Sequence, residues 1–184
     1  MAAAIVIAAI GTSPVSAQAP AVGSMAPDFS GSAATRYGVL DQPVKLSDFR
    51  GKTVVVAFFP KARTRGCTIQ MESYRDKYPE LFGRDVVVMG ISADADTAQA
   101  NWAREADFPM LFVSDVEGTI GKLYGAWNEE RKYDTRALFV VDPEGKVTYA
   151  IPNFNVLAAD SYTTLAAEVS KARGSAGHAG HSGD

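Results

Sequence analysis

The residues best suited to chemistry lie in one segment, which ends at the only cysteine of the chain, Cys67. From Pro60 the segment reads Pro-Lys-Ala-Arg-Thr-Arg-Gly-Cys, and it joins an apolar run to an amphipathic one. We expect a strand before the segment and a helix after it. Cys67 then falls at the carboxyl end of a strand, where reactive groups of α/β sheets gather. The unpaired N–H groups and the dipole of a helix's first turn favour a thiolate at that point.

Polar side chains precede the cysteine in this segment. Thr64 stands three residues before Cys67, so its hydroxyl can approach the sulfur across the turn. Threonine is also a common helix N-cap, and the two roles are compatible. Arg63 and Arg65 add positive charge, although such loop side chains more often face solvent than take part in catalysis. The segment therefore predicts a reactive thiolate in an electropositive turn.

The lone cysteine excludes several classes of site. It cannot form an internal disulfide, a CxxC pair or a cysteine-rich zinc site, so thiol chemistry at Cys67 needs an outside partner. Thr64 occupies the place of the attacking cysteine of a CxxC motif, which argues against a thiol–disulfide oxidoreductase. His178 and His181 lie in a Gly/Ser-rich tail, which disfavours a Cys/His protease and makes a metal site weak. We predict no metal and no cofactor.

The elements that position this segment follow from hydrophobic patterning. Residues 52–59 and 85–91 are short apolar runs rich in β-branched residues, as expected for strands buried on both faces. Apolar residues recur at near-helical spacing over residues 68–82. The predicted elements, in chain order, are strand 52–59, helix 68–82, strand 85–91, helix 94–107, strand 110–113 and helix 118–124.

The C-terminal third predicts a hairpin and a closing helix. Apolar runs at 137–141 and 146–151 flank Asp-Pro-Glu-Gly, a turn signal typical of an antiparallel hairpin. A last helix is expected at 158–171. This order of elements predicts a thioredoxin-like α/β fold, in which helices flank a central mixed β-sheet, with an insertion at 108–126.

That topology places Arg136 beside the cysteine. In the thioredoxin-like order, the strand at 137–141 runs antiparallel to the strand at 52–59, so the start of one lies beside the end of the other. Arg136 is then a neighbour of Cys67, although the two are far apart in the sequence. A guanidinium there favours the thiolate over the neutral thiol.

On these residues the chain resembles the peroxiredoxins, specifically the subgroup that includes the bacterioferritin comigratory proteins. The signature PxxxTxxC of that family is matched by Pro60, Thr64 and Cys67. The similarity covers nearly the whole domain, since further matching motifs occur in the same order. These motifs lie at residues 25–29, 46–52, 108–115 and 136–142.

The resemblance implies a catalytic role for four residues. Cys67 would be the peroxidatic cysteine, which Thr64 and Arg136 activate together with the peroxide. Pro60 would shield the pocket from water. The thiolate would attack hydrogen peroxide or an organic hydroperoxide and become a sulfenic acid, which an external thiol reduces. The implied reductant is a thioredoxin-, glutaredoxin- or glutathione-like thiol, and the implied assembly is a monomer or homodimer.

Two positions depart from the family pattern. Glu72 stands five residues after Cys67, where many relatives have a resolving cysteine, so the chain resembles the one-cysteine type. Arg65 stands where relatives often have proline. A second interpretation stays open at this point: a redox-sensing or holdase-like protein whose Cys67 oxidises without turnover.

Size and composition fit a single globular domain. The chain has 184 residues, of which 47 % are hydrophobic and 21 % charged. A net charge of −3 with scattered cations argues against a nucleic-acid partner, and we predict no membrane partner.

The two ends of the chain differ from its middle. Apolar residues 2–10 and the small residues 15–17 predict a signal peptide over 1–17, which is too short to span a bilayer. The protein would then be periplasmic or secreted, and otherwise cytoplasmic. Residues 18–173 are the predicted domain, with an irregular start at 18–35, and residues 174–184 are a predicted disordered tail.

Overall fold

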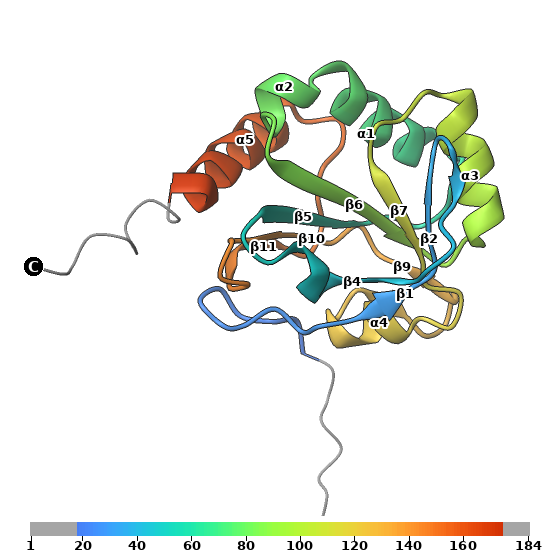
Figure 1. Ribbon diagram of the computed structural model, residues 1–184, viewed down its shortest axis with the longest axis horizontal. Helices are drawn as coiled ribbons and strands as arrows, with labels where there is room; N and C mark the ends of the chain where they lie inside the picture. Colours follow the sequence, from blue (N-terminus) through green and yellow to red (C-terminus); the bar gives the residue numbers. More distant parts are fainter. Residues whose placement is uncertain (1–17, 175–184) are drawn as a thin grey trace, which may run out of the picture.

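A computed structural model describes residues 18–174, so the predicted signal peptide and the residues after 174 lie outside the described part of the chain. The chain forms a seven-stranded mixed sheet with helices packed on it (Figure 1). This is the predicted thioredoxin-like α/β fold. The strands, in order across the sheet, are β11 (Val147–Ile151), β10 (Leu138–Val141), β5 (Thr53–Phe58), β6 (Val86–Ser92), β7 (Leu111–Ser114), β2 (Ala33–Thr35) and β3 (Gly38–Val39).

The central strand β5 is buried on both faces, as its apolar sequence predicts. Val55 and Ala57 face one core, whereas Val54, Val56 and Phe58 face the other. The strand pairs in parallel with β6 and antiparallel with β10. Parallel pairing puts the carboxyl ends of β5 and β6 at the same edge of the sheet, where the segment ending at Cys67 begins.

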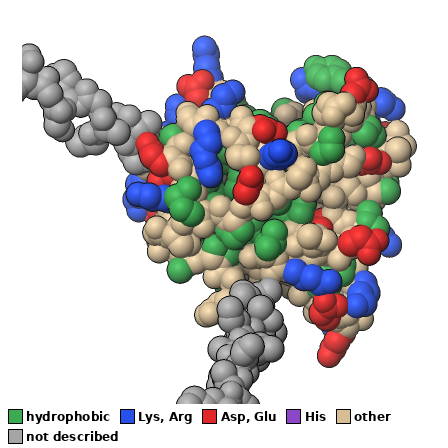
Figure 2. Space-filling view, turned by 60° about the horizontal axis from the view of Figure 1, so that its bottom comes forward, with side chains coloured by type: hydrophobic (Ala, Val, Ile, Leu, Met, Phe, Trp, Pro, Cys, Tyr) green, Lys and Arg blue, Asp and Glu red, His purple; other side chains and the backbone are tan. Residues whose placement is uncertain are grey.

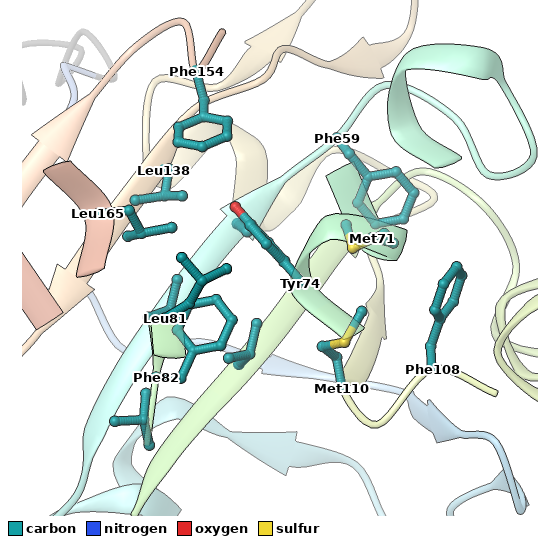
Figure 3. Close-up of a cluster of buried hydrophobic side chains, with 14 of the residues drawn as sticks. Phe59, Met71, Tyr74, Leu81, Phe82, Phe108, Met110, Leu138, Phe154 and Leu165 are labelled. Carbon is teal, nitrogen blue, oxygen red and sulfur yellow. The ribbon is translucent and has the colours of Figure 1, made fainter. Parts of the chain in front are cut away.

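The first core lies between the sheet and the helices α1 (Arg65–Asp76), α2 (Tyr78–Leu81), α3 (Asp96–Glu105) and α5 (Ala159–Gly174). Figure 3 shows part of it, where Tyr74 of α1 lies among Leu138, Leu165 and Phe82. The second core lies on the other face, under α4 (Thr119–Leu123) and the N-terminal segment (Figure 1). Within residues 18–174, no helix combines the length and apolar character needed to cross a bilayer.

The predicted helix at 68–82 is wrong in two respects. It begins earlier, at Arg65, and it breaks at Lys77 into α1 and α2. Pro79 explains the break, because it has no N–H to donate to the carbonyl of Arg75 and its ring would clash with that group. The last helix also extends past its predicted end, to Gly174.

The predicted irregular start at 18–35 is also partly wrong. Strand β2 joins the main sheet beside β7, and β1 (Ser30–Gly31) pairs with β4 (Val44–Lys45). Ala33 and Ala34 are fully buried. Small residues carry little strand signal, so their burial against neighbouring strands is a tertiary effect. A one-turn 3-10 helix, η1 (Leu46–Phe49), and a hairpin of β8 (Trp127–Asn128) and β9 (Tyr133–Asp134) complete the fold.

Candidate active site

Cys67 is the third residue of α1 and is fully buried. The helix begins directly after the loop that follows β5, so the sulfur lies near the carboxyl end of the central strand, as predicted. With Gln70, Met71 and Tyr74, Cys67 forms the buried face of α1. These residues follow the spacing of one helical face, which is why they point into the sheet together.

Arg136 lies beside the cysteine because of the register between β10 and β5. Leu138 pairs with Ala57, and the Phe58 N–H donates to the Ala137 carbonyl at 2.8 Å. Arg136 therefore precedes β10 at the end of β5. Its Nη2 donates to Cys67 Sγ at 3.5 Å. The predicted neighbourhood of guanidinium and sulfur is present.

Gln70 holds the guanidinium in place, and sequence reasoning missed it. Arg136 Nη1 donates to Gln70 Oε1 at 2.6 Å, and Gln70 Nε2 donates to the Tyr74 hydroxyl at 3.0 Å. Gln70 is fully buried, so its amide needs both partners. The available signal was a polar residue three positions after Cys67, on the apolar face of the helix.

The Tyr74 hydroxyl ends this network inside the first core. Burial raises the pKa of Tyr74 well above its usual value, so the hydroxyl stays neutral. Figure 3 shows its ring among apolar side chains of α1, α5 and the sheet. The two hydrogen bonds from Arg136 through Gln70 to Tyr74 therefore tie the guanidinium to the buried first core.

Thr64 occupies the N-cap position of α1, but its side chain does not cap the helix. It is exposed, and its hydroxyl donates to the Lys61 carbonyl at 2.8 Å. Pro60 is half-buried at the start of the same loop. Arg65 is exposed, as predicted.

Two contacts anchor the loop between β5 and α1. The Ala62 N–H donates to Asp94 Oδ2 at 2.7 Å, and Arg63 Nη2 donates to Glu105 Oε1 at 2.9 Å. The hydrogen bond from Arg63 lowers the pKa of Glu105. Arg63 is thus solvent-facing, as predicted, but it ties the loop to α3.

Gly66 lies next to the Arg136 guanidinium. A Cβ at this position would lie 3.0 Å from Arg136 Nη2. A larger residue would displace the guanidinium, so the Gly-Cys pair suits the close approach of Arg136 to the sulfur.

Comparison with known proteins agrees with this geometry. The model of the AhpC/TSA family matches residues 22–150. The chain belongs to this family. A protein named putative peroxiredoxin bcp from Haemophilus influenzae is 34 % identical over 141 residues, covering 73 % of this chain and 88 % of the relative. Peroxiredoxin Bcp from Escherichia coli K12 is 33 % identical over 139 residues, covering 71 % and 89 %.

Solved structures of other family members share the fold. Peroxidoxin BcpB from Mycobacterium tuberculosis superposes with a TM-score of 0.71 at 27 % identity, covering 84 % of this chain and 99 % of that one. AhpC from Enterococcus faecalis, at 20 % identity, superposes with a TM-score of 0.75 and covers 90 % and 99 %. The chain is therefore a peroxiredoxin of Bcp-like sequence, and with one cysteine it is of the one-cysteine type.

Glu72 on α1 stands five residues after Cys67, at the position where the sequence comparison expects a resolving cysteine. Its side chain is half-buried. This peroxiredoxin has no second cysteine anywhere in its sequence. Among residues 18–174 no group of three or more His, Cys, Asp or Glu side chains could hold a metal, and His178 and His181 lie outside that range. On the face shown in Figure 2, cationic and anionic side chains are interspersed.

Proposed function

We propose that this chain is a thiol-dependent peroxidase that reduces hydrogen peroxide and organic hydroperoxides through Cys67. The observation that supports it most directly is the guanidinium of Arg136, which donates to Sγ at 3.5 Å and is oriented by Gln70. A sulfur placed for packing alone would gain nothing from a half-buried cation held at this distance.

The reaction begins with attack of the Cys67 thiolate on one peroxide oxygen. The O–O bond breaks, the other oxygen leaves with a proton as water or alcohol, and Cys67 becomes a sulfenic acid. A free cysteine is only ~3 % ionised at pH 7, so complete ionisation accelerates the attack by at most ~30-fold, or about 2 kcal/mol. The remaining acceleration must come from polarising and aligning the O–O bond. Arg136 can do both, because one guanidinium can contact sulfur and peroxide together.

Thr64 and Pro60 complete the proposed site. The exposed Thr64 hydroxyl bonds, among residues 18–174, only to the Lys61 carbonyl, so it can turn toward a bound peroxide oxygen. Pro60, half-buried at the end of β5, keeps water from the sulfur without adding an N–H that would compete for it.

The sulfenic acid must be reduced by an external thiol, because the chain has no resolving cysteine. This requirement separates the peroxidase from a redox sensor or a holdase-like protein. A peroxidase consumes many equivalents of peroxide when a thiol is supplied, whereas a sensor oxidises once.

The test is peroxide consumption with dithiothreitol, by the wild type and by Cys67→Ser. The wild type should turn over repeatedly and the variant should not. After one equivalent of peroxide without thiol, intact mass with a sulfenic-acid trap should show a single adduct on the wild type and none on Cys67→Ser. The variant also controls for oxidation of the five methionines. Turnover by Cys67→Ser at the wild-type rate would refute the proposal.

For the N-terminus, we propose cleavage after Ala17 and export from the cytoplasm, on the sequence pattern alone. N-terminal sequencing of the protein recovered from fractionated cells tests this. A mature protein that begins at residue 1 or 2 would contradict it.

A further inference from the structure

A basic cavity opens at the same edge of the sheet as Cys67. It has a volume of about 360 Å³ and is lined by Pro60 and Lys61, residues 93–95 and residues 131–133. Pro60 and Lys61 begin the loop that ends at Cys67. Tyr133, which also lines the cavity, lies three residues before Arg136 in the sequence. The cavity therefore touches both segments that build the proposed active site.

Its lining is dominated by positive charge. The lining contains three cations, Lys61, Arg131 and Lys132, and one carboxylate, Asp94. Asp94 Oδ2 is already occupied, since it accepts from the Ala62 N–H at 2.7 Å and from Ser92 Oγ at 2.9 Å.

Two of these cations, Lys61 and Arg131, have no carboxylate partner among the described residues. Lys132 is paired with Glu129 at 2.7 Å. Within residues 18–174, neither Lys61 nor Arg131 forms an ion pair. Among the described residues, the Arg131 guanidinium donates only to the Tyr133 hydroxyl, at 2.9 Å. Unpaired cations around a concave site attract an anionic ligand.

We propose that this cavity, the reductant cavity, binds the carboxylates of a small anionic thiol that reduces the oxidised Cys67. The inference rests on the proposed peroxidase function and names the class of its second substrate. A volume of about 360 Å³ suits a small molecule, whereas a protein reductant would need a broad complementary surface.

The chemistry requires two thiol molecules per cycle. The first thiol attacks the sulfenic sulfur, an S–S bond forms, and the S–O bond breaks to release water. The second thiol attacks the first thiol's sulfur in the mixed disulfide. A new S–S bond forms between the two thiols, the bond to Cys67 breaks, and Cys67 leaves as a thiolate. Two thiols are oxidised to one disulfide for each peroxide reduced. Because Cys67 is fully buried, the 60–66 loop must move to admit the first thiol, while Arg131, which lies outside that loop, holds the carboxylates of the thiol.

The experiment uses three small thiols of different charge: glutathione, which is net negative, dithiothreitol, which is uncharged, and cysteamine, which is positive. The rate constant for reducing preformed Cys67 sulfenic acid is measured for each thiol on the wild type and on Arg131→Glu and Lys61→Glu. Each variant-to-wild-type ratio cancels the intrinsic reactivity of the thiol. In both variants, we expect the rate with glutathione to fall about 3- to 10-fold relative to the rate with dithiothreitol. The rate with cysteamine should rise relative to the rate with dithiothreitol.

Arg84→Glu is the matched control, because it makes the same charge change at an exposed residue just before β6, at the opposite edge of the sheet. It should leave all three rates unchanged. Raising the ionic strength should reduce the preference of the wild type for glutathione over the other two thiols. Under the same conditions Arg131→Glu should show little such preference.

The possible failures are distinguishable. If the three thiols respond equally to Arg131→Glu and Lys61→Glu, the cavity does not bind the anionic thiol and the inference is wrong, although the peroxidase proposal stands. If no thiol supports peroxide consumption and no sulfenic acid forms, the proposed function itself fails.

Discussion

Asp134 should make the stability of this protein depend on pH in a way that one substitution removes. Its carboxyl on β9 is fully buried, and neither oxygen has a hydrogen-bond partner among residues 18–174. Burial, together with the nearby charge of Asp115, raises the pKa of Asp134 to about 8. Burial also raises the pKa of Asp115.

The sign follows from the two states. In the unfolded chain an aspartate ionises near pH ~3.9, so between about pH 4 and 8 the folded state holds a proton that the unfolded state has lost. The free energy of unfolding then falls by about 1.4 kcal/mol for each pH unit in this window and levels off above it. From about pH 5.5 to about pH 8.5 the loss is roughly 3 kcal/mol.

Asp134→Asn keeps the shape of the side chain and removes this ionisation. Urea unfolding at the two pH values should show that the variant loses about 3 kcal/mol less than the wild type over this range. In thermal unfolding the wild-type Tm should fall roughly 6–12 °C further than that of the variant. Because the comparison is between pH values, any pH-independent effect of the amide cancels. Asp41→Asn, at an exposed loop position, is the control and should behave as the wild type.

One outcome would refute this reasoning. If the stability difference between Asp134→Asn and the wild type is the same at both pH values, the carboxyl is not held protonated in the folded state.

Four further substitutions test the site and the core. Arg136→Lys keeps the charge but loses one of the two contacts of the guanidinium, so it should slow sulfenic acid formation about 10- to 100-fold in stopped-flow assays. Gln70→Leu should slow the same step. The loss of rate in the double variant should be smaller than the two single losses combined, because both changes act on one network. Gly66→Ala puts a Cβ 3.0 Å from Nη2, so it should slow the same step without lowering Tm. Leu165→Ala removes a fully buried side chain from the first core and should cost about 2–5 kcal/mol in urea unfolding, while the chemistry at Cys67 persists below the transition.

Each of these has a contrary result. Full additivity of Arg136→Lys and Gln70→Leu would mean that Gln70 does not act through the guanidinium. An unchanged rate in Gly66→Ala would mean that the guanidinium has room to shift without consequence. A cost below 1 kcal/mol for Leu165→Ala would mean that the core collapses around the missing side chain.

The local pattern of the sequence was enough to predict the frame around the cysteine. The apolar run that became β5 and the glycine-containing turn before Cys67 predicted a sulfur at a strand-to-helix junction, where the structure has it. The turn after Val141 predicted the hairpin of β10 and β11. These features depend on neighbouring residues and on burial of a continuous apolar run, both of which are visible in a short window of sequence.

Arg136 is an intermediate case. Its place beside the sulfur follows from the antiparallel pairing of β10 with β5, which could be predicted once the fold was assumed. The contact that orients it could not, because Gln70 Oε1 meets the guanidinium only through the packing of α1 against the sheet.

Only the tertiary structure decided the N-terminal strands, the basic cavity and the burial of Asp134. Ala33 and Ala34 have too little side chain to signal a strand, yet β7 buries them. Arg131 and Lys61 are distant in the sequence and meet at one cavity because the loop after β5 and the β8–β9 hairpin both lie beside β6 and the residues that follow it. Contacts between distant segments depend on how whole layers pack, and no local pattern of residue types encodes that.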